Sequence, residues 1–189
     1  MNWTRVPEMA VNVEGTIITV PEFFASRCFV SIAQFLEFCE TTGYQTIAER
    51  TNSYRTIRSN PEIKEYATVG QDLRDVPANY VTLYDAKQFA DYARCQVISE
   101  KQYLSARYQS MSPEKRAAIG IQTGGTEIDI FWNGACMCVS HDKPIYWWGP
   151  FVRIDRDGTK LVDKNNGPLD DNWFSVDISF AVSRTEPPG

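Results

Sequence analysis

Three helix starts are marked in this chain by the spacing of a capping box. In a capping box, a Ser or Thr hydroxyl and a polar side chain three residues later satisfy the free backbone N–H groups that begin a helix. The pairs with this spacing are Ser31–Gln34, Thr82–Asp85 and Ser99–Gln102, of which Thr82–Asp85 is the looser match. The pattern predicts helices that begin near Ser31, Thr82 and Ser99.

Apolar residues repeat with a helical period behind the first two of these starts. Behind Ser31 they are Ile32, Phe35, Leu36, Phe38 and Cys39, and behind Thr82 they are Ala86, Phe89, Ala90 and Ala93. Gly43 then stands where the first helix would end, at the usual site of a left-handed closing residue. We therefore expect two main amphipathic helices whose aromatic side chains lie in the core.

The remaining patterns are mostly those of strands. Thr16–Val20 is rich in β-branched residues, residues 127–132 alternate at the strand period, and Asn133–Gly134 is a hairpin signal. Further strands are expected at 136–140, 145–148, 151–154 and 173–182, with a turn at 155–158 and a short helix after Pro113. No repeat or linker divides the chain. The sequence predicts one α+β domain, residues 1–189, with a twisted, mostly antiparallel sheet.

Composition and charge restrict the class of protein. The net charge is -5 and no basic cluster is present, which argues against nucleic acid as a partner. No run approaches the roughly 20 apolar residues of a membrane span. Met1–Arg5 lacks the layout of a secretion signal. We expect a cytoplasmic protein with no membrane partner.

The cysteine count points to a reducing compartment. Five cysteines cannot all pair within one chain. Cys28, Cys39 and Cys95 lie in apolar contexts, where a free cysteine behaves as a small hydrophobic residue. Cys136 and Cys138 are separated by one residue on a predicted strand, so both thiols would share one face of a sheet.

The three helix starts resemble, in order and spacing, those of the formylglycine-generating-enzyme (sulfatase-modifying-factor) family. The family's motifs are "VTNxQFxxF…TGY", "PVxxVSWxDAxxYxxW" and "LPTExEWExAAR", and residues 28–44, 76–93 and 97–107 are similar to them. Ile178–Arg184 resembles the family's terminal "GFRLAR" strand, with Ser179 for Gly and Ala181 for the first Arg. The resemblance implies a C-type-lectin fold.

What the resemblance implies for chemistry is a copper(I) site made by two cysteines that oxidises a substrate cysteine. The nearest candidates here are Cys136 and Cys138, but the family's "RGGSW" and "GNVWEW" landmarks are absent. The pair is either two small buried strand residues or a soft-metal site. His141 is the only histidine, which excludes the iron-binding sulfoxide synthases of the same fold. Structural calcium near Asp155 and Asp157 stays open, as some relatives hold it near their C-terminal strands.

Aromatic residues gather in the last third of the chain. Four of the five tryptophans lie there, and adjacent Trp147 and Trp148 must face opposite sides of a strand. One of the two is therefore expected outside a single core, and exposed Trp and Tyr anchor binding sites. The residues expected to contact a ligand are Trp132, His141, Tyr146, Trp147, Trp148 and Trp173.

Two functions follow from these observations. The first is a catalytically degenerate binding module, without a cofactor, that recognises a protein or small ligand through the aromatic C-terminal half. The alternative is a metal-dependent oxidoreductase of the formylglycine-generating type that uses copper at Cys136 and Cys138.

Overall fold

The computed structural model of the chain describes residues 1–13, 16–53, 55–59, 72–74, 76–112, 130, 135–140, 143–154, 160–168 and 178–187. The strands at 143–154 and 160–168 are described by their backbone and register. Several predicted features lie outside these ranges: the helix after Pro113, the strand at 127–132 except Ile130, the Asn133–Gly134 hairpin, the turn at 155–158, and residues Trp132, His141 and Trp173.

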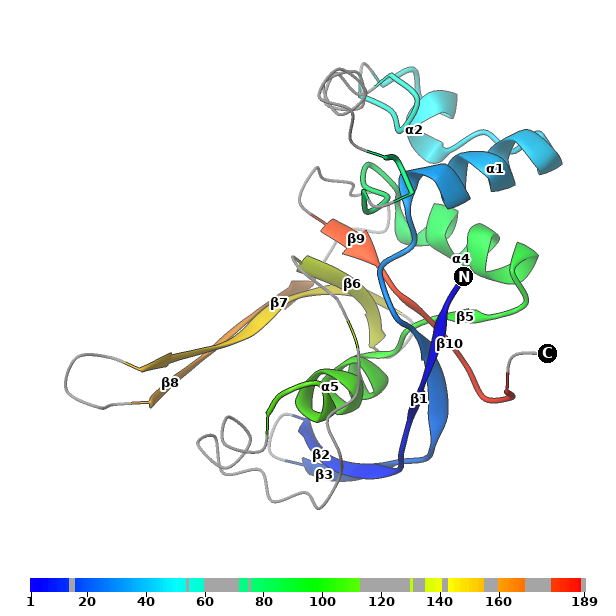
Figure 1. Cartoon of the computed structure of the whole chain (residues 1–189). Coiled ribbons are helices and arrows are strands. Elements are labelled where there is room, and N and C mark those ends of the chain that lie inside the picture. The colour runs from blue at the N-terminus through cyan, green and yellow to red at the C-terminus, as the bar shows by residue number, and fades with distance from the viewer. Residues whose placement is uncertain are drawn as a thin grey trace.

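The described strands form two four-stranded sheets and one hairpin (Figure 1). The first sheet has the order β1 (Trp3–Val6), β4 (Phe23–Ser26), β10 (Val182–Arg184), β5 (Gln96–Val97), and the second the order β8 (Lys160–Pro168), β7 (Lys143–Ile154), β6 (Ala135–Ser140), β9 (Ile178–Phe180). The hairpin joins β2 (Met9–Val13) to β3 (Thr16–Val20), where the sequence predicted a strand. All pairs are antiparallel except β6–β9. The mixed α/β class and the mostly antiparallel sheet are confirmed.

The three predicted helix starts are confirmed. The described helices are α1 (Ile32–Thr42), α2 (Ile47–Arg50), α4 (Leu83–Tyr92) and α5 (Glu100–Gln109). Ser31, Thr82 and Ser99 are the N-caps of α1, α4 and α5, each with a complete capping box. Gly43 closes α1 in the left-handed conformation, with φ 69°. The short helix α2, capped by Thr46 and Glu49, was not predicted.

The predicted terminal strand is two strands in the described part of the chain. β9 pairs with β6 in the second sheet, whereas β10 pairs with β4 and β5 in the first. The change of sheet falls at Ala181, whose carbonyl accepts a 3.0 Å hydrogen bond from the Ile98 N–H. The prediction of one continuous strand was therefore wrong from residue 178 onward, and residues 173–177 lie outside the described ranges.

Two apolar clusters lie on opposite faces of β6. Met137 belongs to the cluster that contains Phe35, Phe89 and Phe180, in which the Phe35 ring centroid lies 5.8 Å from that of Phe89 and 6.1 Å from that of Phe180. Cys136 and Cys138 belong to the second cluster with residues of α5, β2 and β4. Figure 1 shows α1 and α4 on one side of β6 and α5 on the other. This sheet is therefore covered on both faces near β6.

Candidate functional site

Cys136 and Cys138 are fully buried in β6. Each is 0% exposed, and the Cys136 thiol lies 3.5 Å from the Met137 carbonyl oxygen. Burial raises the pKa of Cys138 well above its usual value, and the hydrogen bond that its thiol donates to Cys136 adds to this effect. Copper(I) binds the deprotonated thiolate, and burial disfavours that form. The surroundings fit two small core residues better than a copper site.

Among the described residues, no larger group of metal-binding side chains supports that pair. Within the described ranges, no three His, Cys, Asp or Glu side chains converge on a possible metal position.

None of the helices in the described part of the chain combines the length and apolarity of a membrane span.

All five cysteines are free thiols, and Cys28 is exposed while Cys39 is buried. Cys28 therefore differs from the expected small buried residue.

Three of the predicted ligand-binding residues lie side by side in β7. The register places Tyr146 opposite Met137, Trp147 opposite Cys136 and Trp148 opposite Ala135. A bulge interrupts the β7–β8 register between Trp148 and Phe151.

This register corrects the prediction that one of Trp147 and Trp148 lies outside the core. That prediction assumes that the sheet has a core on one face only. Because β6 is buried on both faces, at Cys136 and at Met137, parity alone no longer places either tryptophan on the surface. Trp132, His141 and Trp173 lie outside the described residues.

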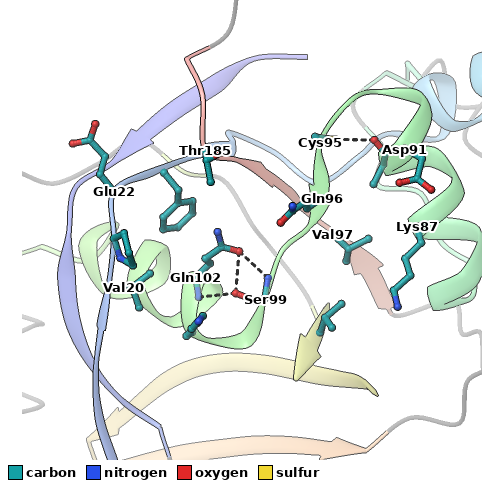
Figure 2. A pocket seen from close by; sticks show the side chains of 15 residues that line it. Val20, Glu22, Lys87, Asp91, Cys95, Gln96, Val97, Ser99, Gln102 and Thr185 are labelled. Carbon is teal, nitrogen blue, oxygen red and sulfur yellow. Dashed lines mark hydrogen bonds between the residues drawn. The ribbon is translucent and has the colours of Figure 1, made fainter. Parts of the chain in front are cut away.

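A cleft of about 590 Å³ opens elsewhere, between α4, α5 and the first sheet. Ligand sites in proteins typically have volumes of about 300–1,000 Å³. Figure 2 shows Lys87 and Asp91 on α4 at one side, with Ser99 and Gln102 at the start of α5 across from them. The apolar part of the lining consists of Val20, Pro21, Phe23, Ala90, Val97 and Val139. The cleft thus combines polar rims with an apolar floor.

Local sequence signals build the walls of this cleft. The α4 helix ends at Tyr92, and Arg94 then takes a left-handed backbone conformation with φ 53°. The chain turns back into the two-residue strand β5, and Ser99 starts α5 by capping it. This sharp path places Cys95 and Gln96 on the cleft wall. The Cys95 thiol lies 3.6 Å from the Ala90 carbonyl oxygen, and burial raises its pKa to about 12.

The charged groups of the cleft differ in their partners. Glu22 forms an ion pair with Arg5 at 2.6 Å, so its charge is already balanced. Lys87, Asp91 and Lys101 are exposed, and none has an ion-pair partner within the described residues.

The cleft reaches the predicted ligand-binding half of the chain at Val139. Val139 pairs with Pro144 of β7, and its N–H donates a 3.1 Å hydrogen bond to the Ile98 carbonyl. Ser140 pairs with Lys143, so the β6–β7 connection begins directly after this contact. The cleft and the β6–β7 hairpin are therefore neighbours in the fold.

A second hollow, of about 650 Å³, is aromatic. It is lined by Phe38, Thr42, Gly43, Tyr44, Gln45, Arg50, Gln88, Asp91 and Tyr92. The Tyr92 ring centroid lies 5.3 Å from that of Phe38, and 45% of Tyr92 is exposed. The Arg50 guanidinium lies 5.5 Å from the ring centroid of nearby Tyr84, which is 50% exposed. This hollow is more open than the cleft, and its charged side chains are one arginine and one carboxylate.

The fold and the cleft together define an α+β protein with two mostly antiparallel sheets and a polar-rimmed cleft. Its fold is similar to that in the crystal structure of CarF, with a TM-score of 0.50 and 13% sequence identity over 98% of each chain. At this identity the likeness concerns the fold alone. No known protein family matches the sequence, and no curated protein matches it.

The sequence predictions did not include this cleft. Its lining comes from β3, β4, α4, β5, α5, β6 and the segment after β10, which are far apart in the sequence. The one local signal was the Ser99–Gln102 capping box, which was interpreted only as a helix start. Lys87 and Lys101 belong to no sequence motif. Only the fold brings the two lysines to one cavity.

Proposed function

We propose that the chain is a ligand-binding module with a C-type-lectin-like fold of the formylglycine-generating-enzyme type, and that it lacks that family's oxidative chemistry. The kinship is supported by three complete capping boxes in the order of the family's motifs. It is also supported by a C-terminal strand pair, β9 and β10, at the position of the family's terminal strand.

The observation that carries the binding role is the open cleft between α4, α5 and β5. Its volume of about 590 Å³ suits a small ligand or a few residues of a partner protein. Its rims present charged side chains without ion-pair partners among the described residues, and these can supply orientation and specificity. The β6–β7 hairpin adjoins the cleft at Val139. Tyr146, Trp147 and Trp148 of β7 remain predicted ligand contacts together with Trp132, His141 and Trp173.

A fragment screen tests the binding role directly. In protein-observed NMR, hits are expected to shift the backbone amide signals of residues 87–102. Gln96→Trp should block these shifts, because Gln96 is exposed on the cleft wall and Trp is well tolerated in a strand. Glu37→Trp, an exposed residue of α1 that does not line the cleft, is the matched control. Hits confined to the aromatic hollow around Tyr92 would contradict the proposed site.

Copper binding tests the oxidoreductase alternative. Anaerobically purified protein and the Cys136→Ala/Cys138→Ala variant are titrated with copper(I) in competition with a copper(I) chelator. We expect the two proteins to bind equally little copper, because burial keeps Cys138 protonated. One copper ion per chain that is lost only in the double variant would overturn the binding-module proposal in favour of the enzyme.

A further inference from the structure

A smaller hollow of about 280 Å³ adjoins the cleft at β5. Cys95, Gln96 and Thr185 line both spaces. The smaller hollow adds Arg94, Arg184 and Glu186. The strand β5 lies at the edge of the first sheet, so the two spaces flank an edge strand that pairs only with β10 among the described strands. We call these two adjoining spaces together the basic groove.

Positive charge dominates the basic groove. Its cations are Lys87, Lys101, Arg94 and Arg184, and its carboxylates are Glu22, Asp91 and Glu186. Arg5 already neutralises Glu22. None of the four cations has an ion-pair partner within the described residues, so the groove keeps an excess of positive charge although the whole chain has a net charge of -5.

Arg184 is held in place and still has unused hydrogen-bonding capacity. Its guanidinium carbon lies 5.4 Å from the centroid of the Trp3 ring, which orients the planar group by a cation–π contact. Its Nε is buried and has no hydrogen-bond partner in the described part of the chain. A guanidinium that is held in place and forms no ion pair among the described residues is well suited to bind a carboxylate or phosphate.

The N-terminus of α5 does not supply this positive charge. The Ser99 hydroxyl accepts the Gln102 N–H, and the Gln102 side chain accepts the Ser99 N–H. The same Gln102 oxygen also accepts hydrogen bonds from the Ser99 and Ser183 hydroxyls. Since these groups satisfy one another, anion recognition falls to the lysine and arginine side chains.

We propose that the basic groove binds a small organic anion with two acidic groups, carboxylates or phosphates, at opposite ends of an apolar body. Lys87 and Lys101 hold one group and Arg94 and Arg184 hold the other. The body of the ligand rests on the apolar floor at Ala90, Val97 and Val139. The proposal specifies the ligand class of the site assigned under the proposed function and rests on that assignment.

Calorimetric titration with ligands of graded length tests the proposal. The probes are straight-chain dicarboxylates from succinate to azelate, the bisphosphates of the matching diols, the corresponding monocarboxylates, and the neutral diamides. Affinity is expected to peak at one chain length, with the monocarboxylate about tenfold weaker or more, because one charged contact is lost. The carboxylate and phosphate series show which of the two acidic groups is preferred.

Charge-removing variants show where the anion binds. Lys87→Gln/Lys101→Gln is expected to weaken the best dianion about tenfold or more. Arg94→Asn should weaken it similarly, and Asn tolerates the left-handed backbone at this position. The control variant Arg50→Gln/Arg74→Gln also removes two positive charges, but from residues that do not line the groove. It should leave the affinity unchanged.

Three outcomes would overturn the proposal. The first is an equal loss of affinity in Arg50→Gln/Arg74→Gln, which would mean non-specific attraction to charge. The second is that the neutral diamide binds as strongly as the dianion. This would show that the groove does not recognise negative charge, although the cleft would still bind ligands. The third is no binding of any probe; the fragment screen then decides separately whether the cleft binds other ligands.

Discussion

The hydroxyl of Tyr44 donates a 2.8 Å hydrogen bond to Oδ1 of Asp85, a carboxyl group that is 0% exposed. The same oxygen accepts the Ile47 N–H at 2.9 Å. The other oxygen, Oδ2, accepts the N–H and the hydroxyl of Thr82, each at 2.8 Å. The aspartate that caps α4 therefore also anchors the segment between α1 and α2, and one buried side chain joins two parts of the chain.

Removing this carboxylate should destabilise the protein strongly. Asp85→Ala leaves four donors without their acceptor in a buried site, and we expect a loss of about 3 kcal/mol or more in the free energy of unfolding. Tyr44→Phe removes one of those donors and should cost about 1 kcal/mol. Urea denaturation of the two variants measures both values.

Tyr84→Phe is the control for these two variants. Tyr84 is 50% exposed, so its loss of a hydroxyl should change stability by less than about 0.5 kcal/mol. The double variant Asp85→Ala/Tyr44→Phe should be less destabilised than the sum of the single variants, because both remove the same bond. Simple additivity would show that Tyr44 and Asp85 do not interact in solution.

Stability should fall in alkaline solution through buried acidic groups. Burial raises the pKa of Cys39 from 9.0 to about 11 and that of Cys95 from 9.0 to about 12. Burial and the Asp85 hydrogen bond also raise the pKa of Tyr44. Above pH 9 the unfolded chain loses these protons first, so the folded state binds more protons and its stability decreases as the pH rises.

The size of this pH effect can be assigned to single thiols. Each group that is protonated only in the folded state contributes a slope of about 1.4 kcal/mol per pH unit. Cys39→Ala should therefore reduce the slope of unfolding free energy between about pH 9 and pH 11, whatever its effect on stability at pH 7. Cys28→Ala, an exposed thiol, is the control. Equal slopes in wild type and Cys39→Ala would show that Cys39 ionises freely in the folded protein.

The helix starts were predictable because their signals are local. Ser31, Thr82 and Ser99 each find their partner three residues away, so sequence spacing alone determines the contact. The basic groove was not predictable, because Lys87, Arg184 and Val139 meet only after two sheets and two helices have formed. Local patterns therefore located the scaffold but not the site.

Two predictions in the strand region differ from the structure. The sequence predicts a single terminal strand and a sheet with a core on one face. In the structure, the chain changes from one sheet to the other at Ala181, and separate clusters cover Met137 and Cys136. A strand buried on both faces is typically a continuous apolar run, as residues 135–139 are, whereas the parity argument for the tryptophans assumes a single core.

Gly43 offers a test of backbone conformation without a change in packing. Its φ is 69°, and nothing lies within 4 Å of the position that a Cβ would occupy. Gly43→Ala should therefore cost about 1 kcal/mol through the left-handed backbone alone. Gly43→Asn should cost less, because Asn tolerates this conformation better. Thermal or urea denaturation compares the two, and a larger loss for Asn than for Ala would contradict the conformational explanation.

Cys136 and Cys138 should respond to polarity more than to size. Cys136→Ala/Cys138→Ala leaves small apolar side chains in an apolar cluster, whereas Cys136→Ser/Cys138→Ser buries two hydroxyls there. Each buried hydroxyl without a good partner costs about 1–3 kcal/mol. The Ser variant is therefore expected to be the less stable by that amount or more in urea denaturation. A Ser variant as stable as the Ala variant would mean that this part of β6 is open to water.

The two adjacent tryptophans should differ in their effect on stability. Trp147 pairs in register with Cys136, which is 0% exposed, whereas Trp148 pairs with Ala135 at the end of β6 and adjoins the bulge in β7. Since cross-strand partners share a face of the sheet, we predict from the backbone register that Trp147 belongs to the face of the Cys136 cluster. Trp147→Ala should then cost about 3–5 kcal/mol, as for other core aromatic residues. Trp148→Ala should cost clearly less in the same urea titration, because its partner Ala135 is the first residue of β6 and a bulge in β7 follows Trp148. The opposite order would show that β7 pairs with β6 in a different register, since a shift by one residue exchanges the two faces.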